Sequence, residues 1–278
     1  MSGPLPPGFD PRRIRAVAMD LDRTILGSSL EFTPALKSAV AGAAAAGIEP
    51  IIATGRMFAS ARPYALELGV RAPVICYQGA LVADPVSGEW LLHRPMDVPL
   101  ARQVIRAVSD AGFHMNVYVD DKLFVEELNE EARTYAAHAR LEAHVVGDLL
   151  AWLVEPTTKI VIVGEPVALD ALEAQMRAGF DGRLFIAKSL PYFLEVALPG
   201  VSKGSALEFV CGRLGIDPAD VVAFGDGAND VELLQAAGLG VAVADADPAL
   251  VSHAQWTVPP VAEDGVAGFL AALVSRRR

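Results

Sequence analysis

Two carboxylates that stand two residues apart, Asp20 and Asp22, follow directly after the apolar run 14–19. Like charges this close repel each other, so they need a cation, a shared proton or water in order to coexist. A divalent metal beside a nucleophilic carboxylate meets that need, because the metal neutralises the cluster and can hold a phosphate oxygen. A solvated turn at the end of a strand could carry the same pair, and later segments decide between the two interpretations.

A turn further along the chain carries a hydroxyl residue and a glycine. Thr54 and Gly55 follow the predicted strand 48–53. A hydroxyl and backbone N–H groups at a strand-to-helix turn form a nest that suits an anion. A threonine that only caps a helix would look the same, so this segment alone does not decide.

A lysine stands at the start of a predicted helix. Ser202 can cap a helix that runs towards Leu214, which puts Lys203 in the first turn. A cation there opposes the helix dipole, a penalty that is tolerable if the side chain faces a phosphate. An ordinary surface lysine is the alternative interpretation.

A second acidic group lies in the segment 225–230, which follows the predicted strand 221–224. Its two glycines let the backbone turn tightly, and Asp226 and Asp230 offer oxygen ligands of the kind that Mg²⁺ prefers. An ordinary turn can look similar. However, all four segments end predicted strands or open predicted helices, and open parallel sheets bind ligands outside the carboxyl ends of their strands. The joint pattern therefore predicts one site for a metal and a phosphate.

The elements that position these residues alternate between short apolar runs and helical patterns, which is typical of an α/β fold with a parallel sheet. One helix is expected to begin at Thr33-Pro34, an N-cap and a helical first position, and to end at Gly47. Another helix is expected at 229–237. The predicted strands are 15–19, 48–53, 73–77, 221–224 and 240–244.

The middle of the chain has a different pattern of apolar and polar residues. Stretches such as 115–120 alternate apolar and polar residues, which predicts a sheet with one covered and one open face. We therefore expect an α+β domain, 84–189, inserted into a core made of 13–83 and 190–278. A flexible N-terminal tail, 1–12, is expected to precede the core.

Composition argues against several classes of function. The 278 residues carry a formal net charge of −11, which argues against non-specific binding to nucleic acid or to an anionic membrane. No segment is long and apolar enough to span a membrane, and the start of the chain does not resemble a signal peptide, so a cytoplasmic location is expected. The cysteines, Cys76 and Cys211, are too few for a disulfide framework and are expected to be buried free thiols.

Taken together, the motifs resemble the haloacid dehalogenase-like hydrolases, specifically their Cof-type branch. That family is marked, in this order, by DxDxT, a small hydroxyl residue, a lysine and GDxxND. Here they stand as Asp20-Leu21-Asp22-Arg23-Thr24, Thr54, Lys203 and 225–230. Matches typical of the branch are Ala53-Thr54-Gly55-Arg56, Gly79-Ala80, Phe193-Leu194-Glu195, 200–204 and 263–267. The resemblance implies a Rossmann-like core with a parallel sheet and an inserted α+β cap domain.

The resemblance also implies a Mg²⁺-dependent phosphatase that hydrolyses a small phosphorylated metabolite, a sugar phosphate or similar, through an aspartyl-phosphate. Asp20 would be the nucleophile, and Asp22 would protonate the leaving oxygen and then activate water. The metal would be held by Asp20, Asp22 (through its backbone carbonyl), Asp226 and Asp230. The phosphate would be bound by Leu21, Thr54, Gly55, Lys203 and Asn229.

Three positions depart from the family's usual pattern. Arg23 stands where Gly is usual, Gln78 replaces an Asn, and Asp245 lies in Ala-Asp-Ala where Gly-Asn-Ala is usual. A Gly permits unusual dihedrals, whereas Arg adds a cation beside the site. That cation is either a surface charge or a contact for a substrate carboxylate or second phosphate. None of the three departures replaces a residue at the four catalytic positions, so phosphatase chemistry is still expected.

A cap of the predicted size closes over the site and excludes bulky substrates, which favours a small phosphorylated metabolite. Substrate specificity is expected to come from residues of the cap and from the extra cation of the core. Each candidate has an ordinary alternative as a sheet-surface, solvated or packing residue. The candidates are Arg23, His114, Asn116, Tyr118, Lys188 and Tyr192.

Two other functions stay open at this point. A phosphosugar mutase shares the aspartyl-phosphate but returns the phosphoryl group to sugar, so product analysis separates it from a phosphatase. A non-catalytic phosphometabolite sensor could retain the fold. The intact Asp20 and Asp22 count against a sensor, which has no need of both carboxylates.

Overall fold

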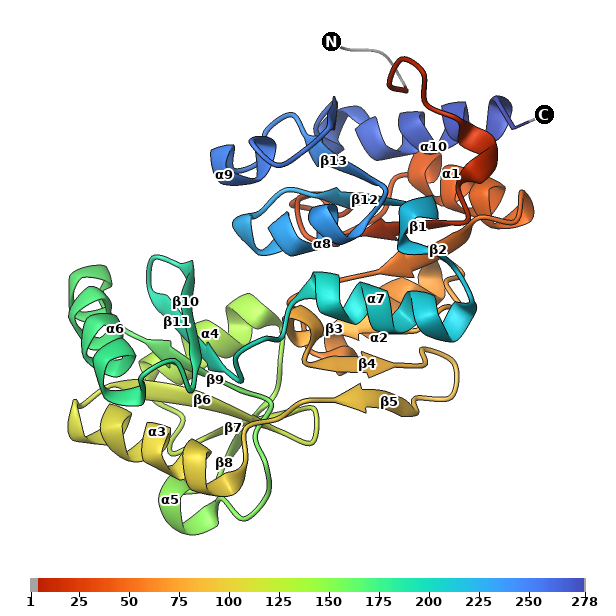
Figure 1. Ribbon diagram of the computed structural model, residues 1–278. Helices are drawn as coiled ribbons and strands as arrows, with labels where there is room; N and C mark the ends of the chain where they lie inside the picture. Colours follow the sequence, from red (N-terminus) through yellow and green to blue (C-terminus); the bar gives the residue numbers. More distant parts are fainter. Residues whose placement is uncertain (1–4, 278) are drawn as a thin grey trace. The chain divides into compact units, whose positions relative to one another are not determined.

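The computed structural model describes residues 5–277, apart from the His138 side chain, and its contacts divide this part of the chain into two compact units (Figure 1). The first unit consists of the residues up to Leu92 together with those from Val201 onward, and the second is His93–Gly200. The second unit therefore interrupts the first along the sequence. The finer prediction, an inserted domain bounded at 84 and 189, stays a prediction.

The first unit is built on a five-stranded parallel sheet with the strand order β14-β13-β12-β1-β2. Its strands are β1 (Ala16–Met19), β2 (Glu49–Ile52), β12 (Val221–Gly225), β13 (Leu239–Val243) and β14 (Trp256–Val258). All four residues of β1 are buried, as expected for a strand of a parallel sheet that is covered on both faces. Because β1 lies between β2 and β12, the segments that leave these three strands begin side by side at one edge of the sheet. The predicted α/β class is confirmed.

The predicted strand 73–77 lies outside this parallel sheet. It forms β3 (Val74–Cys76), which pairs antiparallel with β4 (Leu81–Ala83), and β5 (Trp90–His93) completes a three-stranded sheet. An isolated bridge between Ala53 and Ile75 links β3 to the end of β2.

The helices of the first unit begin where the sequence places capping residues. Thr33 Oγ1 accepts the backbone N–H of Leu36 at 3.1 Å and starts α1, and Ser202 with Ser205 forms a capping box that starts α7. The helices are α1 (Pro34–Ala45), α2 (Phe58–Glu67), α7 (Lys203–Leu214), α8 (Val231–Ala236), α9 (Pro248–Val251) and α10 (Gly265–Ser275). Short 3₁₀ turns lie at Pro11–Arg13, Tyr77–Gly79, Pro218–Asp220, Ala228–Asp230 and Val261–Glu263.

Part of the predicted flexible tail is described, and it packs on the first unit. Leu5 and Pro11 are buried, and the ring centroid of Phe9 lies 6.1 Å from that of Phe269 in α10. The remainder of the predicted tail, 1–4, lies outside the described residues.

The second unit has a six-stranded sheet with the order β10-β11-β9-β6-β7-β8, in which only the pair β7 and β8 is parallel among the described strands. The strands are β6 (His114–Val119), β7 (Lys122–Val125), β8 (Ala143–Val145), β9 (Lys159–Val163), β10 (Phe185–Leu190) and β11 (Phe193–Ala197). The helices are α3 (Val98–Asp110), α4 (Glu130–Ala139), α5 (Leu149–Trp152) and α6 (Pro166–Phe180).

One face of this second sheet carries the core of the unit. Met115 and Val117 of β6 pack in one cluster with residues of α3 and α6. Because side chains of a strand alternate between faces, His114, Asn116 and Tyr118 lie on the other face. Within residues 5–277, no helix is both long enough and apolar enough to cross a membrane.

Candidate active site

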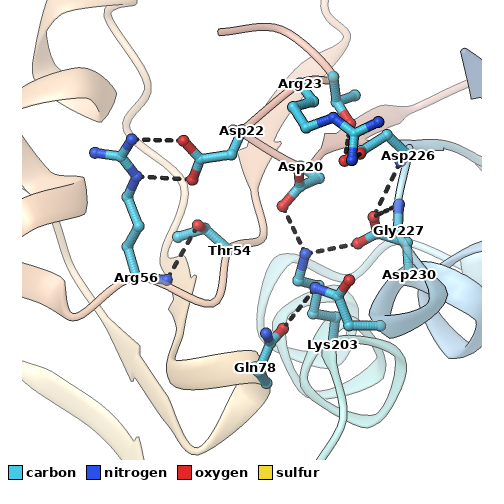
Figure 2. Close-up of polar contacts among 12 residues, drawn as sticks. Asp20, Asp22, Arg23, Thr54, Arg56, Gln78, Lys203, Asp226, Gly227 and Asp230 are labelled. Atoms are coloured by element: carbon cyan, nitrogen blue, oxygen red, sulfur yellow. Dashed lines mark hydrogen bonds and ion pairs between the residues drawn. The ribbon is translucent and has the colours of Figure 1, made fainter. Parts of the chain in front are cut away.

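The predicted chemistry-bearing residues of the first unit come together at the carboxyl ends of β1, β2 and β12 and at the start of α7 (Figure 2). Asp20 follows β1 directly, and Asp226 follows β12 directly. Lys203 is the first residue of α7. Residues that lie up to about two hundred positions apart in sequence therefore share one edge of the sheet.

A fully buried lysine bridges two of the carboxylates. Lys203 Nζ donates to Asp20 Oδ1 at 2.5 Å and to Asp230 Oδ1 at 2.6 Å, and its side chain is 0% exposed. Burial alone would lower the pKa of Lys203, but Asp20 and Asp230 raise it above its ordinary value. Burial also raises the pKa of Asp20 well above its usual range, an effect that Lys203 opposes and Asp230 reinforces. The lysine is therefore held as a cation among the carboxylates.

The third carboxylate of this group has two partners of its own. Asp226 Oδ1 accepts the Thr24 hydroxyl at 3.3 Å, and Asp226 Oδ2 lies 3.3 Å from Nη1 of Arg23. Burial and the nearby Asp230 raise the pKa of Asp226 to about 6, against the lowering effect of Arg23 and Lys203. Thr24 thus ties the loop after β1 to Asp226.

Asp230 holds the loop that carries Asp226. Its Oδ2 accepts the backbone N–H groups of Asp226 and Gly227, each at 3.1 Å. Gly225 lets this carboxylate approach, because a Cβ added at Gly225 would lie 2.5 Å from the Cβ of Asp230. The glycine at this position is therefore needed for close packing.

These three carboxylates fit a divalent metal. One oxygen from each of Asp20, Asp226 and Asp230 lies within 4.8 Å of the other two, and all three residues are buried. Carboxylate oxygens are the ligands that Mg²⁺ prefers. When all three carboxyl groups are ionised, the two cationic side chains, Lys203 and Arg23, leave one negative charge for an added cation to neutralise.

The carboxylate of Asp22 lies apart from this cluster. Arg56 donates to it twice, from Nε to Oδ2 at 2.8 Å and from Nη2 to Oδ1 at 2.5 Å, and Figure 2 shows Asp22 turned towards Arg56. The Arg56 guanidinium also lies over the ring of Tyr64, 4.9 Å from its centroid. Sequence reasoning assigned no role to Arg56. Its position directly after Thr54-Gly55 was the one available signal.

Three of the predicted phosphate-binding residues, Thr54, Gly55 and Asn229, lie around Gln78, whose backbone N–H donates to the Thr54 carbonyl at 3.1 Å. Thr54 Oγ1 accepts the backbone N–H of Arg56 at 3.2 Å, and a Cβ on Gly55 would lie 2.4 Å from Gln78 Nε2. Gln78 has a φ of 58°, in the left-handed region, and its Oε1 accepts Asn229 Nδ2 at 3.0 Å. This departure from the family pattern therefore joins two loops of the site.

Leu21 is placed to shape the loop rather than to expose a side chain. Its side chain is fully buried, and its carbonyl accepts the backbone N–H groups of Ile25 and Leu26 at 3.1 and 2.8 Å. Any contact of Leu21 with a phosphate would have to come from its main chain.

The specificity candidates of the second unit do not lie on one face. Tyr118 and His114 share the face of β6 away from α3 and α6. The Tyr118 hydroxyl lies 2.6 Å from that of Tyr135, and His114 Nδ1 lies 3.2 Å from Asn129 Nδ2. Lys188 donates to Asp170 Oδ1 of α6 at 2.5 Å, which places it on the helix-covered face.

The other two candidates of this unit differ in exposure. Asn116 is fully buried, and its Nδ2 has no hydrogen-bond partner among the described residues. Tyr192, in the turn between β10 and β11, is 51% exposed.

Comparison with known proteins gives one consistent result. Residues 17–270 match the family described as haloacid dehalogenase-like hydrolase. The chain is 30% identical to the pyridoxal phosphate phosphatase YbhA of Escherichia coli (strain K12), over 92% of this chain and 97% of that protein. It is 29% identical to the HMP-PP phosphatase of Cronobacter sakazakii, over 86% of this chain and 87% of that protein.

A solved structure agrees with these matches. The crystal structure of TM0651 from Thermotoga maritima superposes with a TM-score of 0.86 at 28% identity, and the match covers 93% of this chain and 97% of that one. The family, the fold and the named phosphatases all agree with the resemblance seen in the motifs. The chain therefore belongs to the haloacid dehalogenase-like hydrolases, in their Cof-type branch of phosphatases.

Proposed function

We propose that this chain is a Mg²⁺-dependent phosphatase that hydrolyses a small phosphorylated metabolite through an aspartyl-phosphate on Asp20. The observation that carries the proposal is the buried Lys203, which contacts Asp20 and Asp230 while Asp226 lies beside them. A cation between a nucleophilic carboxylate and its neighbours is suited to holding a phosphoryl group, whose oxygens carry charge throughout the reaction.

Two steps transfer the phosphoryl group. An oxygen of Asp20 forms a bond to phosphorus while the bond from phosphorus to the leaving oxygen breaks, and Asp22 gives that oxygen a proton. Asp22 then takes a proton from water, whose oxygen attacks phosphorus and breaks the bond to Asp20. Arg56 orients the Asp22 carboxylate through two hydrogen bonds. The products are the dephosphorylated metabolite and inorganic phosphate.

In this proposal, one set of residues binds the metal and another set binds the phosphoryl group. Mg²⁺, when held by Asp20, Asp226, Asp230 and the backbone carbonyl of Asp22, would neutralise the carboxylates and the phosphoryl oxygens. Lys203, Thr54, Gly55, Asn229 and the main chain of Leu21 would bind the phosphoryl oxygens.

The substrate is a sugar phosphate or a similar small metabolite phosphate. Two relatives carry names for such activities, a pyridoxal phosphate phosphatase and an HMP-PP phosphatase. The net charge of −11 argues against nucleic acid as a partner. We place the enzyme in the cytoplasm, as expected in the sequence analysis.

The test is phosphate release from a panel of small phosphate esters, with Mg²⁺ and with EDTA. Asp20→Asn removes the nucleophile without changing its size and should lower the rate by about a thousandfold or more. Asp220→Asn is the matched control, because Asp220 lies before β12 and forms an ion pair with the exposed Arg13. The control should retain full activity.

Two results would contradict the proposal. One is the absence of phosphate release from every ester by folded protein with Mg²⁺. The other is equal release by wild type and Asp20→Asn. Identification of the products separates the two enzyme classes. Inorganic phosphate marks a phosphatase, whereas a sugar that carries the phosphoryl group again marks a mutase.

A further inference from the structure

Arg23 has a backbone conformation that side chains rarely adopt. Its φ is 62°, in the left-handed region, which glycine enters freely and a long side chain enters at a cost. The conformation is imposed by the loop, because the Arg23 N–H donates to the Leu26 carbonyl at 2.8 Å. A strained residue that persists at a functional site invites the question of what its side chain does there.

The side chain of Arg23 joins two loops of the site. Its Nη1 lies 3.3 Å from Asp226 Oδ2, and its Nη2 donates to the backbone carbonyl of Asp245 at 3.3 Å. Asp245 is itself a departure from the family pattern. Two of the three departures found in the sequence are therefore in contact with each other, and one of them, Arg23, also contacts a carboxylate of the metal cluster.

Both carboxylate oxygens of Asp226 have a protein partner. Oδ1 accepts the Thr24 hydroxyl, and Oδ2 faces the Arg23 guanidinium. The Thr24 hydroxyl is neutral and can share the oxygen with a metal ion. The guanidinium is a full positive charge and repels a metal ion that approaches the same carboxylate.

We propose that Arg23 is a tethered cation that competes with the divalent metal for Asp226, so that this chain binds Mg²⁺ more weakly than it would with an uncharged residue at position 23. The inference rests on the metal site of the proposed function, and it concerns a residue to which the proposed phosphoryl transfer assigns no step. The Arg23 side chain is 66% exposed, so solvent and salt screen the competition and keep it moderate.

The test measures Mg²⁺ binding by isothermal titration calorimetry, without substrate, at low ionic strength. Arg23→Ala and Arg23→Gly remove the charge and should bind Mg²⁺ about threefold to tenfold more tightly than wild type. Arg23→Lys keeps the charge and should stay within about twofold of wild type. The gain in the two uncharged variants should shrink in about 0.5 M KCl, where screening is strong.

A matched control is available in the same unit. Arg13 contacts Asp220 at 3.4 Å, and its side chain is 67% exposed, close to the exposure of Arg23. Arg13→Ala removes the same charge at a distant surface position and should leave Mg²⁺ affinity at the wild-type value. The Gly and Ala variants also separate charge from backbone strain, because only Gly relieves the left-handed conformation.

The outcomes are distinct. Unchanged or weaker Mg²⁺ binding by Arg23→Ala would overturn the inference, as would a gain seen in Arg23→Gly alone, which would assign the effect to strain. The inference would also be overturned if neither the wild type nor any variant bound Mg²⁺ measurably. Failure of the proposed function is measured separately, as absence of phosphate release. A tighter-binding Arg23→Ala in a protein without phosphatase activity would support the competition and refute the function.

Discussion

Replacement of Lys203 by methionine tests the arrangement of charges at the centre of the site. The side chain is 0% exposed and reaches Asp20 and Asp230 at 2.5 and 2.6 Å, and the side chains of those partners are 7% and 1% exposed. Removal of one partner from a buried ion pair costs about 3–5 kcal/mol, because the other charge stays buried without compensation. Since Lys203 serves two carboxylates, we expect Lys203→Met to fall near the upper end of that range.

The assay is urea unfolding followed by tryptophan fluorescence. In a Trp152→Phe background the remaining tryptophans, Trp90 and Trp256, both lie in the first unit, so the signal reports on the unit that contains the site. The control is Lys37→Met, which breaks the exposed pair of Lys37 and Glu67, at 2.7 Å with side chains 46% and 44% exposed. That change should cost at most about 0.5 kcal/mol.

Added Mg²⁺ gives the same prediction a second measurement. A ligand that binds only the folded state stabilises it in proportion to the logarithm of its concentration over its dissociation constant. Without Lys203 the cluster carries one more negative charge, so Mg²⁺ should raise the free energy of unfolding of Lys203→Met by about 1 kcal/mol more than that of wild type. The reasoning would be refuted if Lys203→Met lowered the free energy of unfolding by less than about 1 kcal/mol, no more than Lys37→Met does.

Three further predictions concern close packing, orientation and reactivity. Gly225→Ala places a Cβ 2.5 Å from that of Asp230 and should cost about 1–3 kcal/mol in urea unfolding. Gly42→Ala in α1 meets nothing within 4 Å and should stabilise by up to about 1 kcal/mol; equal effects would contradict both. Arg56→Lys loses the two-pronged contact with Asp22 and should lower kcat about tenfold with little change in KM, whereas Arg62→Lys should have no effect. Burial, with Asp217 and Glu208, raises the pKa of Cys211 to about 11. At pH 8 only about one Cys211 thiol in a thousand is therefore ionised. Iodoacetamide should modify Cys211 only after the protein is unfolded, and mass spectrometry detects the modification. Rapid modification of Cys211 in the native protein would contradict this prediction.

Much of the first unit could be predicted from local patterns. The predicted strands 221–224 and 240–244 correspond to β12 and β13, and Thr33-Pro34 starts α1 as expected. These elements follow from short-range rules, since apolar runs form buried strands and capping residues satisfy the first turn of a helix. The strand 73–77 was harder to place, because the sheet that a short apolar run joins depends on its partners and not on its composition.

The contacts of long side chains could not be predicted. The pairing of Arg56 with Asp22, and of Arg23 with Asp226, depends on distances between loops that no sequence spacing encodes. The same holds for Lys188, because the β10–β11 pairing shifts register between Lys188 and Leu190, and such a shift changes which residues face the helices. Residue types at the carboxyl ends of strands were predictable, and their individual partners were not.

The pairing of β1 with β12 also determines when the parallel sheet can form during synthesis on the ribosome. The second unit is one continuous stretch, His93–Gly200, and all of its strands have been synthesised before β12 (Val221–Gly225) exists. Until then β1 has an unpaired edge, which is the kind of surface that invites wrong pairing between chains. Asp20 is made well before Lys203 and Asp226, so it can contact them only after α7 and the segment that follows β12 have been synthesised. The group of charged side chains at this edge of the sheet is therefore complete only after the second unit has been made.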